Sequence, residues 1–493
     1  MLEREVKLAV PSTFQLPNLD HLSPELHPSP ADERRLETVY YDTPDLRLVR
    51  WGCSLRLRQG EGWTLKLPTT SEGQALSRRE LEFPNRESRP PDAALSLVLA
   101  YVRRSPLVPV VSLSTVRRRT ELRNGDGRVM AELVDDDVSV IQALRVQNRF
   151  REVEVELRDP AAEPLVQPIL ARLRQAGAAD EGNLTKLVRA LGARATAPPE
   201  VDPIAISGAA TAGDVVRHAI ATAVASLLRH DPGVRLGDDL EDVHRARVAT
   251  RRLRSQLRTF RPLLDPAWAN ALRDQLRWLA DGLGTVRDKQ VMSQRMRSRA
   301  ASLPPDDGAA VAELADDLWG ESEEARGRLV LDMRSDRYLD LVDRLVEASR
   351  SPALTPDAQQ PASTVLPSLA KRDWKRLRRG VAKLPSTPDD PELHRIRILA
   401  KRLRYASEAA KDVVGKPATR LATAATNLQD VLGDHQDSVT ARAWLRDAAA
   451  AGPNAFVAGE LSMKEHQAAA EDRAAFPRIW KKLGRKRLRK WMI

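Results

Sequence analysis

The sequence predicts an α+β protein of two domains, an antiparallel β-barrel followed by an all-α bundle, and three observations lead to this fold class. The chain has 493 residues, which exceeds the roughly 250–300 residues that one hydrophobic core serves. Residues 1–195 contain short segments in which apolar and polar residues alternate, whereas later segments have apolar residues at helical spacing. Residues 196–209, rich in proline and small residues, are typical of a linker.

The expected β domain covers residues 1–195. Successive residues of a strand point to opposite faces, so each alternating segment predicts a strand with one polar and one apolar face. Glycine-containing turns separate several of these segments, as antiparallel pairing requires. The predicted strands are 3–8, 54–58, 63–67, 78–83, 130–134 and 151–157.

The expected helical domain covers residues 210–493 and contains an internal repeat. Residues 244–254 return as 394–404, with six of eleven positions identical. About 40 residues after each copy comes a Leu-Gly pair with an aspartate four residues beyond the glycine, ending at Asp288 and Asp437. The sequence therefore predicts two similar halves, at about 210–350 and 363–493. The apolar spacing places helices at 240–263, 268–283, 392–413 and 420–432.

Charge is distributed unevenly between the two domains. The net charge is +11, and residues 1–195 hold 29 Lys and Arg against 28 Asp and Glu, whereas residues 196–493 hold 50 against 40. A basic surface favours a polyanionic partner, namely nucleic acid, a polyphosphate or an anionic membrane surface. Cys53 is the only cysteine, which excludes a disulfide framework and cysteine zinc sites. Without an apolar segment typical of a leader or a membrane span, we expect a cytoplasmic protein.

The repeated segments predict two helices that each have one cationic face. On a helix, His244, Arg247, Arg251 and Arg254 share one arc, with apolar residues opposite. Like charges repel unless an anion neutralises them, so the duplicated arc favours an anion site over an ordinary solvated face. A metal site at the histidines is the weaker alternative, because arginines rather than carboxylates follow them. The basic segment 478–490 is interpreted as a terminal helix that packs its tryptophans, rather than as a surface for polyanions or membranes.

These motifs resemble the CHAD family, the conserved histidine α-helical domains. The resemblance covers roughly residue 210 to the C-terminus. It implies a helical bundle that binds inorganic polyphosphate, and an association with polyphosphate granules in the cytoplasm. His435 lies in the second Leu-Gly segment, where the first copy has Val286, so the two halves are not fully symmetric. The expected polyphosphate-binding residues are His244, Arg247, Arg251, Arg254, His394, Arg397, Lys401, Arg404 and His435.

In the β domain, charged residues of both signs alternate along the predicted strands. A polar strand face is usually solvated, but several strands of a barrel direct such faces to a common interior. There, carboxylates bind a hard divalent cation and basic groups bind phosphate oxygens. The acidic members are Glu3, Glu5, Glu80, Glu82, Glu152, Glu154 and Glu156, and the basic ones are Lys7, Arg56, Arg58, Lys66, Arg117 and Arg119.

This part of the chain resembles the CYTH family of triphosphate tunnel metalloenzymes, whose signature is an N-terminal Glu-x-Glu-x-Lys. The match covers essentially residues 1–195 and includes Tyr41-Asp42-Thr43 and the Leu184-Thr185-Lys186 segment. Two positions stay open: whether Arg78 or Arg79 faces inward, and which residue of 135–137 accompanies Glu132.

The resemblance implies metal-assisted hydrolysis of a phosphoanhydride, with Mg²⁺ or Mn²⁺ as the cofactor. The expected metal ligands are Glu3, Glu5, Glu80, Glu82, Glu154 and Glu156. The expected catalytic set is Glu3, Glu5, Lys7, Glu154 and Glu156. The expected phosphate-binding residues are Arg56, Arg58, Lys66, Arg117, Arg119 and Lys186.

Both domains therefore point to chains of phosphate. The first hypothesis is a triphosphatase that acts on inorganic triphosphate or short polyphosphate and carries a polyphosphate-binding helical domain. The alternatives are a non-catalytic protein that docks on polyphosphate and senses a ligand, or a thiamine triphosphatase or adenylate cyclase. Nucleic acid is a less favoured partner, since aromatic residues for base stacking are scarce near the cationic arcs.

Overall fold

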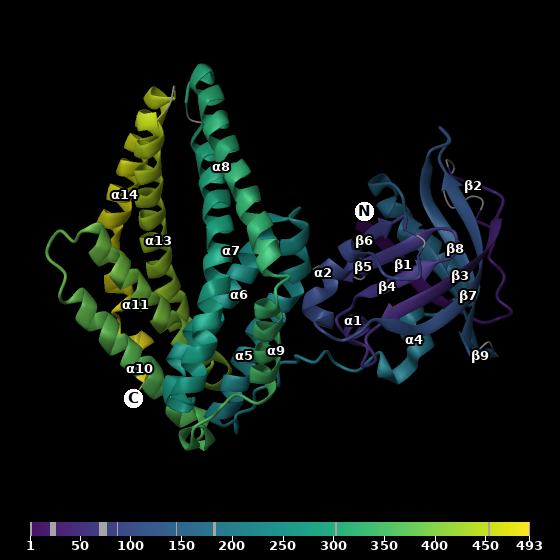
Figure 1. Cartoon of the computed structure of the whole chain (residues 1–493), viewed down its shortest axis with the longest axis horizontal. Helices are drawn as coiled ribbons and strands as arrows, with labels where there is room; N and C mark the ends of the chain where they lie inside the picture. Colours follow the sequence, from purple (N-terminus) through teal and green to yellow (C-terminus); the bar gives the residue numbers. More distant parts are fainter. Residues whose placement is uncertain are drawn as a thin grey trace. The chain divides into compact units, whose positions relative to one another are not determined.

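The chain divides into two compact units, Met1–Glu200 (unit 1) and Val201–Ile493 (unit 2). This computed structural model describes residues 2–19, 26–68, 76–85, 87–143, 145–180, 184–300, 303–451 and 454–492, without the side chains of residues 2–5, 76–78, 160, 305, 306 and 451. Unit 1 contains the strands and unit 2 is built from helices (Figure 1). The predicted α+β class, with a β domain followed by a helical domain, is confirmed.

In its described residues, unit 1 is a nine-stranded antiparallel sheet with four α-helices. The strands are β1 (Leu2–Val10), β2 (His27–Pro28), β3 (Asp32–Asp42), β4 (Ser54–Arg58), β5 (Gly62–Pro68), β6 (Leu76–Phe83), β7 (Val108–Arg123), β8 (Val129–Gln142) and β9 (Arg145–Leu157). The helices are α1 (Arg47–Arg50), α2 (Asp92–Val102), α3 (Val166–Gln175) and α4 (Lys186–Leu191).

The sheet curls back on itself. Its strand order is β2-β7-β3-β4-β5-β6-β1-β9-β8, and β7 pairs in addition with β8. The β1–β6 pairing, however, spans only Leu2 to Glu5 among the described residues. From Glu5 to Val10, β1 pairs with β9. The predicted antiparallel β domain is therefore confirmed, and its described strands form a curled sheet.

The apolar face of the sheet forms the core of unit 1. Val153 and Val155 of β9 are buried together with Leu8 of β1 against Ile169 and Leu170 of α3. Because side chains alternate along a strand, burying Val153 and Val155 on this face directs Glu152, Glu154 and Glu156 to the opposite face. Packing on α3 thus decides which residues of β9 line the interior.

Asp42 has a structural role at the end of β3. Its buried carboxylate accepts hydrogen bonds from the backbone amides of Thr43 (2.7 Å), Leu48 (2.8 Å) and Val49 (2.9 Å). These bonds satisfy amides at the start of α1 that have no partner within the helix. The Tyr41-Asp42-Thr43 motif therefore shapes the turn that follows β3.

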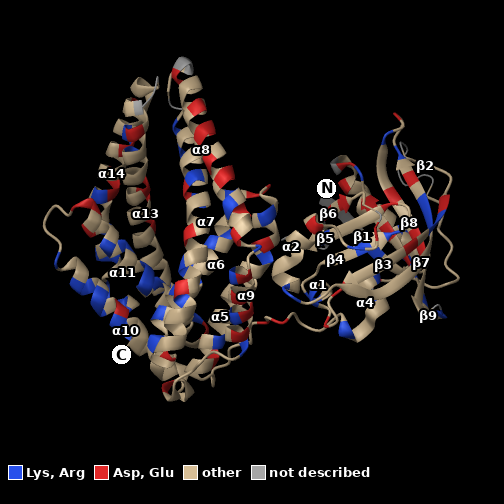
Figure 2. Ribbon diagram, viewed as in Figure 1, with Lys and Arg blue, Asp and Glu red and all other residues tan. Residues whose placement is uncertain are grey.

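Unit 2 consists of ten α-helices in the part of the chain that the structure describes. They are α5 (Ala212–Leu236), α6 (Leu240–Thr259), α7 (Pro266–Ala300), α8 (Pro305–Asp332), α9 (Asp336–Arg350), α10 (Ala362–Val381), α11 (Asp390–Ala409), α12 (Lys411–Val414), α13 (Lys416–Ala451) and α14 (Ala455–Leu483). The repeated segments lie on α6 and α11, as the apolar spacing predicts. Figure 2 shows Lys and Arg concentrated on α10 and α11, whereas Asp and Glu are frequent on α8.

The two halves of unit 2 are joined by reciprocal hydrogen bonds at their starts. The amide of Ala212 donates to the carbonyl of Gln360 (2.9 Å), and the amide of Ala362 donates to the carbonyl of Ala210 (3.0 Å). These residues are 150 positions apart in matching pairs, which is the period of the sequence repeat. The bonds therefore relate α5 to α10 by a local pseudo-twofold symmetry.

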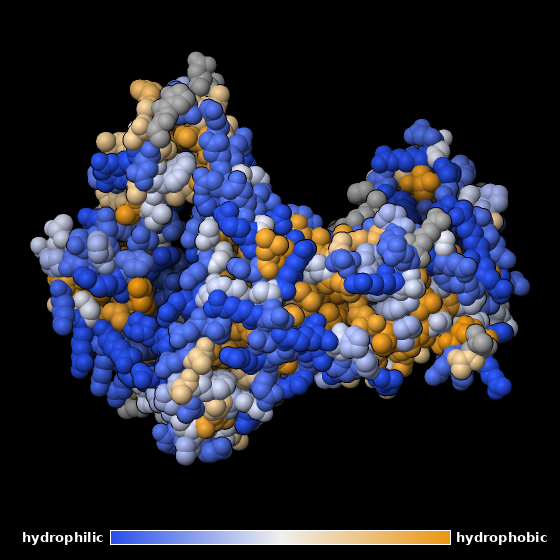
Figure 3. All heavy atoms as spheres, in the orientation of Figure 1, coloured by the Kyte–Doolittle hydropathy of each residue, from blue (hydrophilic) through white to orange (hydrophobic). Residues whose placement is uncertain are grey.

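The C-terminal segment packs into the core of the second half. The ring of Trp480 stacks on that of Trp374, with centroids 5.5 Å apart, and Leu488 and Trp491 pack against the same cluster. This agrees with the interpretation of the basic 478–490 segment as a packing element. No helix in the described ranges is long and apolar enough to cross a membrane, and the face of unit 2 seen in Figure 3 is mostly hydrophilic.

Candidate functional site

The strand register brings charged side chains of both signs to the inner face of the sheet in unit 1. Lys7 of β1 lies opposite Glu154 of β9. Across β9, Glu152 lies opposite Asp136 of β8, which in turn lies opposite Arg117 of β7. Directly opposed residues of paired strands point to the same face, so five charged groups from four strands share one interior.

These side chains surround a small cavity of about 60 Å³. Five cations and two carboxylates line it, together with polar and apolar groups. The lining residues are Lys7, Tyr40, Ser54, Arg56, Lys66, Arg117, Glu154, Glu156, Thr185, Lys186 and Leu187. The excess of cations favours an anion in the cavity.

Lys186 is the centre of the ion pairs in this cavity. Its amine lies 2.9 Å from a carboxylate oxygen of Asp136 and 2.7 Å from oxygens of Glu152 and Glu154. Lys186 is the first residue of α4, whose start is capped by the Thr185 hydroxyl accepting from the Val188 amide. The N-terminal end of α4 thus places the amine of Lys186 in the sheet interior.

The other cations also contact carboxylates across the strands. Arg117 donates two hydrogen bonds to Asp136, at 2.9 and 2.7 Å, and Lys7 pairs with Glu154. Arg56 and Lys66 each lie 3.2 Å from a carboxylate oxygen of Glu80. In this arrangement each cation of the cavity is held by a carboxylate, so an incoming phosphate must replace some of these contacts.

Electrostatics keep the buried ion pairs charged. Burial alone raises the pKa of Glu154, but Lys186, Lys7 and Arg117 outweigh it and hold the pKa well below its usual value. Burial likewise lowers the pKa of Lys186, but its carboxylate neighbours raise it well above the usual value. The pKa of Asp136 is lowered as well, because Lys186 and Arg117 outweigh the effect of burial. The cavity therefore stays a set of full charges at neutral pH.

Some predicted residues lie at the edge of the cavity rather than in it. Arg58 binds Glu61 (2.8 Å). Arg119 is 39% exposed and lies 3.2 Å from Glu121. Glu82 lies opposite Thr64 of β5, on the same strand face as Glu80, and is exposed. Only a ligand longer than the cavity would reach these residues.

The backbone register of the N-terminal glutamates agrees with the motif, but their side chains lie outside the described residues. Glu3 lies opposite position 78, and Glu5 lies opposite Glu156. Arg78 shares its register face with Glu80, since the two are two residues apart on β6, whereas Arg79 is on the alternate face. At the other open position, Asp136 accompanies Glu132 on the inner face, because Asp135 and Asp137 alternate with it.

Several cavity residues were missed at the level of sequence. Tyr40 is buried beside Arg56, and although burial raises its pKa, Arg56 and Lys186 bring the pKa below its usual value. Ser54 and Thr185 add hydroxyls. Alternation with Arg56 along β4 could have placed Ser54 on the inner face. Tyr40 gives no comparable signal, since a tyrosine at an alternating position is equally typical of an apolar core.

The donors on β9 fit a hard divalent cation in their chemistry. Glu154 and Glu156 present carboxylate oxygens on the inner face, and Glu5 lies opposite Glu156. Among the described side chains, however, no group of three or more His, Cys, Asp or Glu is arranged to hold a metal ion. The described side chains by themselves therefore form no metal site, and the side chains of Glu3 and Glu5 lie outside the described residues.

In unit 2, the cationic faces of α6 and α11 are supported by the two Leu-Gly segments. Arg247 donates to Asp288 of α7 at 2.8 Å and passes over Gly284. Arg397 passes over Gly433 of α13 in the same way, and its Nε is buried with no hydrogen-bond partner in the described residues. The glycines thus make room for arginine side chains at the two faces.

Arg251 and Lys401 lie where the two cationic faces meet. Burial and the charges of Arg251, Arg397 and Arg404 lower the pKa of Lys401 to about 7. Burial also lowers the pKa of Arg251, and the charges of Arg247 and Arg404 lower it further. Cations from both halves therefore repel one another, and a bound anion would relieve this repulsion.

The remaining predicted residues of unit 2 have distinct surroundings. Arg254 is repelled by Arg277 and Arg273 of α7, two cations that the repeat did not reveal because the second half has Ala422 and Thr426 there. Arg404 lies 3.2 Å from Glu408.

The three histidines of the set differ from one another. His394 is hydrogen-bonded to Gln436 (2.8 Å). Burial and the charge of Arg287 lower the pKa of His244. His435 is 1% exposed, and its Nε2 lies 3.2 Å from Asp390. His435 therefore contacts the N-terminal end of α11, not the cations in the middle of that helix.

The fold and these two sites define a protein with a charged site inside a β domain and a basic helical domain. Comparison with known families agrees. The family model described as "CYTH domain" matches residues 1–187, and the model described as "CHAD domain" matches residues 218–446. The chain is 32% identical to "Uncharacterized protein Rv2226" of Mycobacterium tuberculosis over 98% of this chain and 96% of that protein. The chain belongs to this family, in which a CYTH domain precedes a CHAD domain.

Two solved structures resemble part of the chain. "PptA from Streptomyces chartreusis" is 24% identical and covers 55% of this chain and all of that one, with a TM-score of 0.47. The "CHAD domain from the plant Ricinus communis" is 25% identical and covers 58% of this chain and 96% of that one, also with a TM-score of 0.47. CYTH domains belong to a superfamily of metal-dependent phosphate-transfer enzymes. The specific reaction and ligand of this chain are proposals.

Proposed function

We propose that unit 1 hydrolyses inorganic triphosphate or short polyphosphate in a metal-dependent reaction, and that unit 2 binds inorganic polyphosphate. The observation that carries the first part is the cavity in which five cations face two carboxylates inside a curled sheet. Phosphate oxygens are matched by Lys and Arg donors, and a carboxylate-bound cation neutralises the remaining charge.

The cations of the cavity bind and orient the phosphate chain. Arg56 and Lys66 come from the paired strands β4 and β5, and Arg117 comes from β7. All three reach the same space as Lys186. They stabilise the negative charge that develops on the oxygens as a phosphoryl group leaves. Since Lys186 and Lys7 are both held by Glu154, substrate binding exchanges part of these contacts for phosphate oxygens.

The cofactor proposed for this site is Mg²⁺ or Mn²⁺. Glu154 and Glu156, with Glu3, Glu5, Glu80 and Glu82, are the carboxylates proposed to hold it. The metal would polarise the phosphoryl group and lower the pKa of a water molecule. Glu80 is engaged by Arg56 and Lys66, so its part in metal binding depends on release of these cations.

For unit 2, the support is the cationic set of α6 and α11. Burial, together with repulsion among its members, lowers the pKa of Lys401 to about 7. A polyanion removes this repulsion, and a chain of phosphates provides several charges at close spacing. The proposed ligand contacts include Arg247, Arg251 and Arg397 in addition to Lys401.

The test is orthophosphate release from inorganic tripolyphosphate by metal-stripped protein, with and without added Mg²⁺ or Mn²⁺. We expect release only with metal. In Lys186→Met it should fall at least about hundredfold, because one cation of the phosphate site is lost. Arg149→Met is the matched control, since Arg149 is exposed on the outer face of β9. Loss of hydrolysis with retained polyphosphate binding in Glu3→Ala/Glu5→Ala would assign the reaction to unit 1.

A second candidate is a non-catalytic protein that docks on polyphosphate and senses a phosphate ligand in unit 1. The saturation of the described cavity carboxylates by Lys and Arg favours it, since such a site holds anions without a metal. Absence of phosphate release with either metal, together with metal-independent tripolyphosphate binding, would select this function.

Substrate competition separates the remaining possibilities. Faster turnover of thiamine triphosphate, or conversion of ATP to cyclic AMP, would assign one of the other activities of the CYTH class. Displacement of polyphosphate by duplex DNA at equal phosphate concentration would contradict the proposed preference of unit 2, because both polymers bind through the same salt-dependent contacts.

A further inference from the structure

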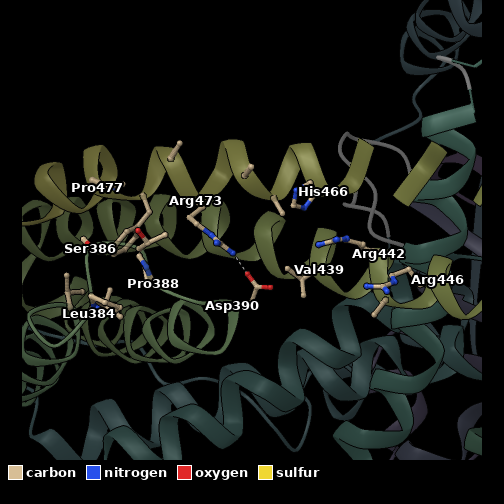
Figure 4. Close-up of a pocket in the computed structure, with 18 residues that line it drawn as sticks. Leu384, Ser386, Pro388, Asp390, Val439, Arg442, Arg446, His466, Arg473 and Pro477 are labelled. Carbon is tan, nitrogen blue, oxygen red and sulfur yellow. Dashed lines mark hydrogen bonds and ion pairs between the residues drawn. The ribbon is translucent and has the colours of Figure 1, made fainter. Parts of the chain in front are cut away.

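Unit 2 contains a second cavity that is lined by none of the polyphosphate-binding residues proposed above. It lies between α13, α14 and the segment that joins α10 to α11, and has a volume of about 880 Å³ (Figure 4). Ligand pockets for small organic molecules have volumes of about 300–1,000 Å³. We propose that this cavity binds a small organic phosphate, a molecule with an apolar body and one or more phosphate groups.

One end of the cavity is cationic. Arg442 and Arg446 are one helical turn apart on α13, and His466 faces them from α14 (Figure 4). In the described part of the chain, neither arginine forms an ion pair with a carboxylate, unlike Arg295, which binds Glu465. Two arginines directed into one hollow without a counter-charge form a site for a phosphate group.

The opposite end is apolar. Val381, Leu384 and Pro477 line it together with Phe476, whose side chain is buried against the core of the second half. Figure 4 shows Leu384 and Pro477 at the end away from Arg442. An apolar or aromatic group bound there would lose contact with water at little cost in polar contacts. Ser386 also lines the cavity and adds a hydroxyl to which a polar atom of the ligand could hydrogen-bond.

A polar pair lies between the two ends. Arg473 of α14 forms an ion pair with Asp390, the first residue of α11, and Asp390 also contacts His435. The Nε of Arg473 is buried and has no hydrogen-bond partner among the described residues. This guanidinium is therefore only partly satisfied by Asp390, and a phosphate oxygen beside it would supply an acceptor.

The two-ended lining selects the class of ligand. An inorganic phosphate would satisfy the arginines but leave the apolar end filled with water. A purely apolar molecule would fill that end and desolvate the arginines without pairing them, which is unfavourable. An organic phosphate satisfies both ends at once, and the inference does not depend on the hydrolysis proposed for unit 1.

The test uses the full chain in EDTA, with ATP and 1-naphthyl phosphate as two unrelated organic phosphates, and isothermal titration calorimetry as the measurement. Arg442→Ala/Arg446→Ala removes the cationic end, and Ala470→Trp fills the cavity without changing its charge. Arg420→Ala is the matched control, because Arg420 is an exposed cation of α13 outside the cavity. Ala474→Leu replaces Ala470→Trp if that variant does not fold.

We expect at least one of the two probes to bind the wild type, with an affinity about tenfold lower in both cavity variants and unchanged in the control. Inorganic tripolyphosphate binding should be retained in all of them, which shows that the proposed function of the other sites is intact. Failure of both probes to bind the wild type, or equal binding in all variants, would overturn the inference. Weakening by the arginine variant alone would show a general cationic surface and also contradict it.

Discussion

Lys401 of unit 2 has a pKa near physiological pH. Burial and four arginines lower its pKa to about 7, although its ordinary value is 10.5. A bound polyanion reverses the sign of the local potential, so it favours the protonated amine. Binding and protonation at this residue are therefore linked.

The expected outcome is that tripolyphosphate affinity of unit 2 falls as the pH rises from 6 to 8.5. The amine loses its proton near pH 7 in the free protein and then no longer donates a charge-assisted hydrogen bond, which lowers affinity by about tenfold. Titration calorimetry at fixed ionic strength measures this. Lys401→Arg should remove the part of the pH dependence that belongs to the protein, and an unchanged profile in that variant would contradict the role of Lys401.

Glu154 has the corresponding place in unit 1, because Lys7 and Lys186 both bind it. In Glu154→Gln, these buried cations lose their counter-charge, and we expect the stability of the sheet to fall by about 3 kcal/mol. Hydrogen exchange of β9 amides measures the change. Metal-free tripolyphosphate at about 100 times its dissociation constant should restore about 2.7 kcal/mol.

The exposed Asp126, in the turn between β7 and β8, provides the control for this experiment. Asp126→Asn should leave the exchange rates of β9 unchanged. Equal rates in Glu154→Gln and the wild type would mean that the cations do not depend on this carboxylate.

At the scale of elements, the two helix pairs α6–α7 and α11–α13 differ in how closely they hold an arginine. A Cβ at Gly433 would lie 3.2 Å from Nη2 of Arg397, whereas a Cβ at Gly284 would lie 3.8 Å from Nε of Arg247. The second distance is an ordinary contact and the first is tight. The two halves are therefore similar in sequence but unequal in packing at their cationic faces.

We predict that Gly433→Ala weakens tripolyphosphate binding while Gly284→Ala does not. Displacing the Arg397 guanidinium from its rotamer costs about 0.5–1.5 kcal/mol, which corresponds to about a two- to tenfold loss of affinity. Both substitutions favour the helix by up to about 1 kcal/mol, so thermal stability should not fall in either. Equal affinities in the two variants would show that Arg397 does not contact the ligand.

At the scale of the whole molecule, the two halves of unit 2 are connected away from their reciprocal backbone bonds by a buried carboxylate. Glu465 of α14 is fully buried and accepts hydrogen bonds from Arg295 (2.8 Å) and Arg299 (3.1 Å) of α7. Arg295 also donates to Ser438 of α13. Burial raises the pKa of Glu465, but Arg295 and Arg299 outweigh it and lower the pKa below its usual value.

Glu465→Gln is expected to destabilise unit 2 by about 2–3 kcal/mol at pH 7, since it leaves two arginines without their carboxylate. Because the folded pKa is lowered, this stabilisation is present above the ordinary pKa and is lost as the pH falls through the folded value. The difference in unfolding free energy between wild type and variant should therefore shrink below about pH 4. Urea unfolding checks it, with the exposed Glu471→Gln as control; a difference that does not change with pH would contradict the ion pair.

Much of the fold could be predicted because local patterns carry it. The alternation of polar and apolar residues on β9 and the helical spacing on α6 and α11 place the main site residues on their faces. The repeat of 150 residues reveals the two halves. The strand order could not be predicted, since pairs such as β1 with β9 join segments far apart in the chain. Tyr40 and the arginines of α7 near Arg254 were missed because they reach their sites through tertiary packing.

The sequence by itself determined the two-domain order, the family resemblance and the sign of charge on each strand and helix face, because residue type and periodicity are local properties. Only the tertiary structure decided which charges meet: Asp136 rather than its neighbours beside Lys186, His435 beside Asp390, and Arg442 with Arg446 in the second cavity. The physical reason is that ion pairing, desolvation and cavity shape depend on distances between segments far apart in the chain, and those distances are set by the packing of whole elements.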